Sequence, residues 1–75
     1  MEKYRLVNNT EYDFKGVYYV GLNEKYWDMF NIGPRDIAKI YTDLQEAIKD
    51  KEMLKRRFKY EYFEVETIEE WEAKQ

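Results

Sequence analysis

The sequence contains no cysteine, no histidine and no serine. Without cysteine there is neither a disulfide nor a thiolate ligand for a metal ion. Without histidine there is no imidazole ligand, and no side chain whose ordinary pKa lies near neutrality. Because serine and cysteine are the common nucleophiles, only threonine, lysine, tyrosine and the carboxylates remain for covalent chemistry. We therefore expect a protein that is not an enzyme and that holds no metal ion and no cofactor.

Long uncharged runs are missing as well. The longest, residues 16–23, has eight residues, whereas a helix that crosses a bilayer needs roughly 20. The first five residues lack the apolar stretch of a secretory signal. At 75 residues the chain has room for a single domain, 1–75. We expect a cytoplasmic domain with no membrane contact.

Aromatic residues are abundant, at 19% of the chain. Because each ring buries roughly 150–250 Å², a few rings are enough to build a small core. Charged residues make up 39%, with a net charge of −3. The negative balance argues against nucleic-acid binding by this chain alone.

Two strands are predicted in the first third of the chain. In residues 3–8, Tyr4 and Leu6 alternate with Lys3 and Arg5, which is typical of a half-buried strand. Residues 16–21 are β-branched and aromatic between two glycines, which favours a second strand. We expect these two strands to pair as an antiparallel hairpin.

Residues 22–34 fit either a short helix or an ordered loop, closed by a turn at Gly33-Pro34. The segment is rich in large apolar side chains, including Trp27 and Phe30. These side chains either cover an edge of the core or form an exposed binding surface, because tryptophan, tyrosine and methionine are enriched at interface centres.

Residues 37–58 allow two interpretations. Thr42 followed by Gln45 is a capping box, which predicts a helix over 43–57 and a strand over 37–41. The alternative is one long helix from Pro34. We favour the first, because Ile40-Tyr41-Thr42 is β-prone. One helix face then carries a stripe of apolar residues, namely Leu44, Ala47, Ile48, Leu54 and Phe58. Met53 points away from this stripe, beside Lys49 and Arg56.

The last part of the chain predicts a strand over 60–66, with Phe63 and Val65 facing the core. The opposite face would then carry Tyr60, Tyr62, Glu64 and Glu66. A second capping box at 67–70 predicts a short C-terminal helix. The expected fold is therefore α+β, a small antiparallel sheet of three or four strands with the helix 43–57 packed on one face.

The succession of Tyr18-Tyr19-Val20, Ala38-Lys39-Ile40-Tyr41-Thr42, Glu46-Ala47 and Phe63-Glu64-Val65 resembles small accessory proteins encoded by phages and prophages of Gram-positive bacteria. The resemblance spans about residues 16–67, and the spacing between Thr42 and Glu46-Ala47 is one residue longer than in the shortest form of the motif. It carries no active-site motif. It implies a small phage-type protein, in some cases an inhibitor of a host or defence protein such as a CRISPR effector.

Charge is segregated near the end of the chain. Basic residues dominate 49–59, and residues 61–72 contain six glutamates and no basic residue. Such an acidic block can mimic a phosphate backbone towards a basic groove, or simply be a solvated surface. The candidate interaction surface comprises Tyr18, Trp27, Phe30, Met53, Arg56, Tyr60, Tyr62, Glu64 and Glu66.

The leading functional hypothesis is stoichiometric binding to a host or defence protein, for example inhibition of a host nuclease. The alternatives are a nucleic-acid-associated accessory protein and a sponge for a small ligand. We also expect a concentration-dependent homodimer, because a small sheet has unpaired edges and a domain of this size has a small core.

Overall fold

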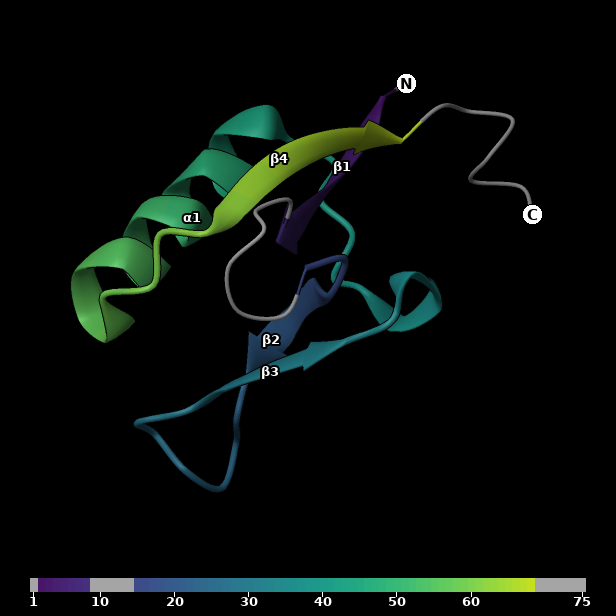
Figure 1. Cartoon of the computed structure of the whole chain (residues 1–75). Coiled ribbons are helices and arrows are strands. Elements are labelled where there is room, and N and C mark those ends of the chain that lie inside the picture. The colour runs from purple at the N-terminus through teal and green to yellow at the C-terminus, as the bar shows by residue number, and fades with distance from the viewer. Residues whose placement is uncertain (1, 9–14, 69–75) are drawn as a thin grey trace.

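The computed structural model describes residues 2–8 and 15–68 and confirms the α+β fold (Figure 1). Four strands form one antiparallel sheet in the order β3-β2-β1-β4, and one helix packs on it. The elements are β1 (Lys3–Asn8), β2 (Tyr18–Leu22), β3 (Phe30–Gly33), the short 3₁₀ helix η1 (Arg35–Ile37), α1 (Leu44–Phe58) and β4 (Phe63–Ile68). Residues 9–14 of the connection between β1 and β2, and residues 69–75 after the start of the predicted C-terminal capping box, lie outside the described residues; Thr67 and Ile68 belong to β4.

The longest strand pairing in the sheet is that of β1 with the edge strand β4. Six consecutive residue pairs join the two strands, among them Leu6 with Val65 and Arg5 with Glu66. Because directly paired residues share a face, Leu6 and Val65 point towards α1, and Arg5 and Glu66 point to the opposite face. The predicted alternation of the first strand is therefore confirmed, as is the inward orientation of Phe63, which is 1% exposed.

The pairing of β1 with β2 is short. Only Val7 and Tyr18 are in register, because the two strands diverge and residues 39–41 fill the space between them. There Tyr41 exchanges two backbone hydrogen bonds with Tyr4, and the Lys39 N–H donates to the Tyr19 carbonyl. The strand predicted over 37–41 was therefore wrong in extent: a single bridge at Tyr41 remains.

Helix α1 runs from Leu44 to Phe58, within one residue of the prediction. Its N-cap is Asp43, whose Oδ1 accepts the Gln45 N–H at 2.8 Å. The capping role predicted for Thr42 is corrected, since the neighbouring carboxylate makes the capping hydrogen bond. The extended backbone at Asp43 also excludes one continuous helix from Pro34.

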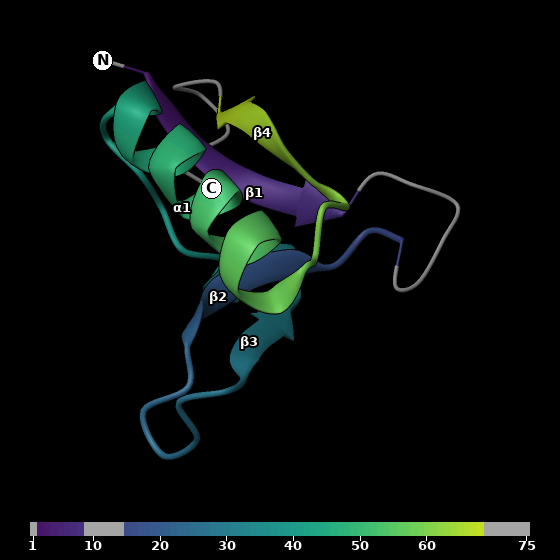
Figure 2. The same ribbon diagram turned by 90° about the vertical axis from the view of Figure 1, so that its left-hand side faces the viewer.

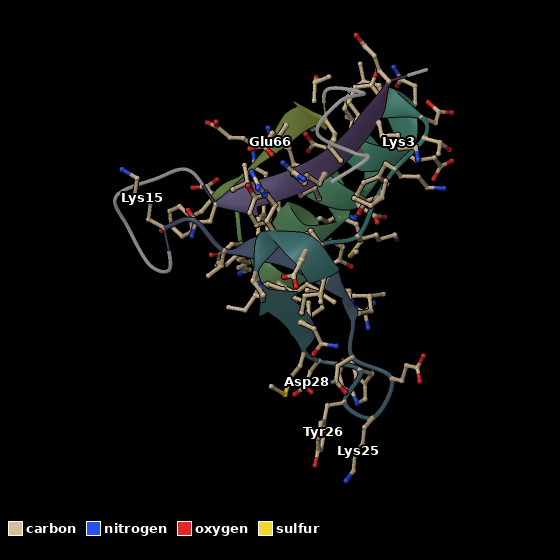
Figure 3. The ribbon with its side chains drawn as sticks, turned by 90° about the vertical axis from the view of Figure 1, so that its right-hand side faces the viewer. Lys3, Lys15, Lys25, Tyr26, Asp28 and Glu66 are labelled. Carbon is tan, nitrogen blue, oxygen red and sulfur yellow. The ribbon has the colours of Figure 1, made fainter. Side chains whose placement is uncertain are left out.

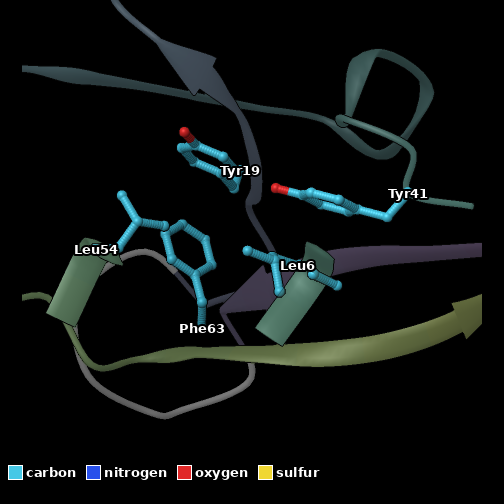
Figure 4. Close-up of a cluster of buried hydrophobic side chains, with 6 residues drawn as sticks. Leu6, Tyr19, Tyr41, Leu54 and Phe63 are labelled. Carbon is cyan, nitrogen blue, oxygen red and sulfur yellow. The ribbon is translucent and has the colours of Figure 1, made fainter. Parts of the chain in front are cut away.

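The main core lies between α1 and the sheet (Figures 2 and 4). It consists of Leu6, Tyr19, Tyr41, Ala47, Leu54 and Phe63. Met53 and Tyr60 are partly buried and pack against this cluster, so their predicted positions on outer faces were wrong. Leu44 and Ile48, which the apolar stripe placed in the core, are 39% and 37% exposed. The buried face is thus rotated from the predicted stripe towards Met53.

Residues 22–34 do not form the short helix that was considered, and the ordered loop that was the alternative is confined to residues 23–29. Phe30–Gly33 is the strand β3, which pairs with β2 in a hairpin containing a register shift between Tyr19 and Gly21. The connecting loop projects from the body of the molecule (Figures 1 and 2). We call residues 22–29 the hairpin tip.

Candidate protein-binding surface

The hairpin tip carries four of the nine exposed large apolar side chains in the described part of the chain, including the most exposed one, Trp27. Trp27 is 78% exposed and Met29 50%, with Leu22 and Tyr26 close behind at 43% and 49%. Figure 3 shows Lys25, Tyr26 and Asp28 at the end of the projecting loop, with Lys25 and Tyr26 directed away from the sheet. Apolar side chains are therefore presented next to charged ones on a protruding element.

Hydrogen bonds within the tip fix its backbone. The side-chain oxygen of Asn23 accepts the N–H groups of Lys25 and Tyr26, both at 2.9 Å. The Asn23 N–H donates to the Met29 carbonyl, and the Met29 N–H donates to the Tyr26 carbonyl. These hydrogen bonds hold the backbone of the loop in a turn. Asparagine side chains commonly stabilise turns by accepting backbone N–H groups in this way.

Two contacts hold the tip to the rest of the molecule. The Arg57 guanidinium of α1 donates a hydrogen bond to the Trp27 carbonyl. At the base of the hairpin, the Phe30 ring packs against Phe58, Tyr60 and Phe63, with centroid distances of 5.1, 5.2 and 6.0 Å. The tip is consequently held in place before any partner binds, although its side chains face solvent.

The structure separates the nine predicted surface residues into three groups. Trp27, Arg56 and Glu64 are exposed. The partly buried group comprises Phe30, Met53, Tyr60, Tyr62 and Glu66. Tyr18 is buried, at 9% exposure. Only Trp27 belongs to the hairpin tip, so the predicted set does not form one surface.

Tyr18 and Glu66 take part in a network on the sheet face opposite α1. The Arg5 side chain is buried and its Nε donates to Glu66, while its guanidinium carbon lies 5.1 Å from the centre of the Tyr18 ring. The Tyr18 hydroxyl is 3.3 Å from the same carboxylate. Burial, together with the Glu66 charge, raises the pKa of Tyr18. Tyr18, predicted as a surface contact, is therefore part of an internal network.

A second tyrosine network lies beside the main core. The Tyr41 hydroxyl donates to Asp50 at 2.6 Å, and the Lys39 ammonium lies 2.9 Å from the same carboxylate oxygen. Burial, followed by this hydrogen bond, raises the pKa of Tyr41 above its ordinary value. Burial also raises the pKa of Tyr19 to about 12. Both phenols remain protonated at neutral pH, so Tyr41 acts as a hydrogen-bond donor to Asp50.

Leu22, Tyr26 and Met29 were not among the surface residues predicted from the sequence. Their signal was the density of aromatic and apolar residues in 22–34, which allowed both a core position and an exposed one. Whether these three side chains are buried or exposed depends on the strand that begins at Phe30, because the residues between this strand and β2 then form a hairpin loop. Phe30 packs against these rings at the base of the hairpin, and the large apolar residues before it lie in the exposed loop.

Comparison of the chain with protein-family models, with curated proteins and with solved structures finds no match. Within residues 2–8 and 15–68, no group of three acidic side chains is arranged to hold a metal ion. None of the helices in the described part of the chain is long and apolar enough to span a membrane.

Proposed function

We propose that the protein acts by stoichiometric binding to another protein and that the hairpin tip makes the central contact. The observation that carries this proposal is the 78% exposure of Trp27 on a loop whose backbone is fixed by its own hydrogen bonds. Tryptophan and tyrosine are the residue types most enriched among those that dominate binding energy. A fixed backbone lowers the entropy that is lost when the loop binds.

The tip also has the composition of an interface with an apolar centre. Trp27, Tyr26 and Met29 supply large apolar contacts, and Lys25 and Asp28 supply a charged rim. The partner that fits is a protein with an apolar pocket that can accept one indole ring. The resemblance to phage accessory proteins favours a host or defence protein as this partner, and inhibition as the outcome.

The experiment compares capture of proteins from a bacterial lysate by the parent chain, by Trp27→Ala and by Ile37→Ala. Ile37 is 54% exposed and lies outside the tip, so it provides a matched control. We expect one protein to be retained by the parent and by Ile37→Ala, and its recovery to fall at least about tenfold with Trp27→Ala, the scale of a lost anchor residue. Recovery that Trp27→Ala leaves unchanged would refute the tip as the binding site.

Fluorescence then tests where the partner binds. The variant Trp71→Phe leaves Trp27 as the single tryptophan, so its emission reports on the tip alone. Titration with the purified partner should shift the emission to shorter wavelength and end at a fixed molar ratio. Recovery of nucleic acid alone, with salt-dependent binding and no protein partner, would instead support the nucleic-acid alternative.

A further inference from the structure

Strand β4 forms one edge of the sheet, and within the described residues it pairs only with β1. The backbone groups of Tyr4 and Asn8 point from β1 towards Tyr41, Val17 and Gly16. Because backbone groups alternate in direction along a strand, Arg5 and Val7 point towards β4 and bond to their partners Glu66 and Glu64. The N–H and C=O groups of Val65 and Thr67 therefore point outwards from the sheet, where another strand can pair.

The face of this edge opposite α1 is acidic at the start of β4, whereas the exposed Lys3 of β1 lies on the same face at the other end, beside Ile68. Glu64 is exposed, and no ion pair joins it to another described residue. Glu66 follows on the same face, where Arg5 neutralises it. Glu61, just before the strand, is exposed as well. A strand that pairs with β4 would thus place its outer side chains beside uncompensated negative charge.

The other face of the edge lies beside an apolar flank of α1. Asp50 and Arg57 lie on the flank that faces Tyr41 and the hairpin. At about 100° per residue, Leu44 and Ile48 lie on the opposite flank, which is the β4 side. Both are more than one third exposed. Side chains of an added strand that point towards α1 would meet these two residues.

We propose that the β4 edge binds an extended segment of a partner protein, in which basic side chains alternate with apolar ones. The backbone pairs with Val65 and Thr67, the basic side chains face Glu64, and the apolar ones cover Leu44 and Ile48. This is strand addition to a sheet edge, in which backbone bonds supply affinity and alternate side chains supply specificity. A second copy of the chain fits less well, because antiparallel pairing centred on Val65 places Glu64 opposite Glu66 of the other copy.

The probe is a capped seven-residue peptide that alternates lysine with valine, and its matched control alternates glutamate with valine. The peptides are titrated into the ¹⁵N-labelled protein to about 1 mM, the range expected for a short strand. We expect the lysine peptide to shift the amide signals of Val65 and Thr67 and to slow their hydrogen exchange. The glutamate peptide should bind at least about fivefold more weakly.

Two variants test the geometry. Thr67→Pro removes an outward N–H that does not bond to β1, so it should lower the affinity for the lysine peptide about fivefold. Thr67→Ala keeps this N–H and should bind the peptide with the affinity of the parent. Glu64→Lys is an exposed substitution that leaves the backbone intact, and it should lower the affinity for the lysine peptide several-fold. Trp27→Ala should have no effect, so failure of this proposal is distinguishable from failure of the hairpin tip.

Three results would overturn the proposal. The first is equal binding of the two peptides. The second is a set of peptide-induced shifts that does not include Val65 and Thr67. The third is protection of these amides that grows with protein concentration when no peptide is present, because it would assign the edge to self-association.

Discussion

Replacement of Phe30 by alanine should weaken the packing of the β2–β3 hairpin against the rest of the domain. The hairpin is joined to β1 by one residue pair in register, so its attachment depends on side-chain packing. Phe30 is the ring that contacts the end of α1 at Phe58 and the start of β4 at Phe63. Phe30 was predicted from the sequence as a surface contact, and this substitution tests whether its role is instead structural.

The expected cost follows from the loss of burial and of ring contacts. Phe→Ala substitutions in cores cost about 3–5 kcal/mol, and the partial exposure of Phe30 places it near 3. A domain of 75 residues has a total stability of roughly 4–11 kcal/mol. At about 4–8 °C per kcal/mol, the midpoint of thermal unfolding should fall by more than about 10 °C.

Urea unfolding followed by circular dichroism measures this cost. Phe30→Leu keeps apolar volume but loses the edge-to-face geometry, so it should cost about 1–2 kcal/mol. Met29→Ala is the matched control on the neighbouring residue, and because Met29 is half exposed its effect should stay within about 0.5 kcal/mol. A cost below about 1 kcal/mol for Phe30→Ala would show that the ring does not hold the hairpin.

Asp43→Ala should cost about 1 kcal/mol in urea unfolding and Thr42→Ala much less, since Asp43 accepts the capping bond; equal effects would contradict this assignment. Tyr41→Phe should cost about 1.5–3 kcal/mol, because the hydroxyl donates to the Asp50 carboxylate, which also pairs with Lys39; the cost should be smaller in an Asp50→Asn background, where the acceptor is a neutral amide, and an equal cost would contradict this. Stability should be lost as the pH rises from 10 to about 12, because unfolded tyrosine ionises near 10 whereas Tyr19 keeps its proton to about 12. Tyr41, whose pKa is also raised by burial, contributes to the same loss, so Tyr19→Phe should reduce the slope of the stability-against-pH curve between pH 10 and 12 without abolishing it, and an unchanged slope would count against the buried phenol.

Local patterns in the sequence were sufficient to predict the strands and the helix whose apolar residues recur with a clear period. The strand around Leu6 and the helix around Leu54 were predicted because alternation and the 3.6-residue repeat are local properties. Phe63 was placed in the core for the same reason. These elements are also the ones that form the main core, so the α+β class followed from them.

The remaining elements depend on contacts between distant residues. Phe30 begins a strand only because rings from α1 and β4 bury it, and no local signal carries that information. Ile40 is in a β-prone segment, yet only Tyr41 pairs, since the segment fills a gap between two strands that diverge. Met53 was assigned to the outer helix face because the stripe was derived from the helix sequence alone, whereas in the fold Met53 packs against the main core. The exposed tip could not be predicted for the same reason.

The pairing of β1 with β4 has a consequence for how the chain folds. Arg5 and Glu66 are neighbours in the sheet but 61 positions apart in sequence. Strand β1 therefore cannot pair with β4 until nearly all of the chain between them has been positioned. Closing so long a loop costs conformational entropy before the contacts between the strands form and compensate for it. The hairpin and the helix are local and can form early. We therefore expect the β1–β4 pair to close last, so substitutions in it should mainly accelerate unfolding, whereas those in α1 should slow the approach to the native state.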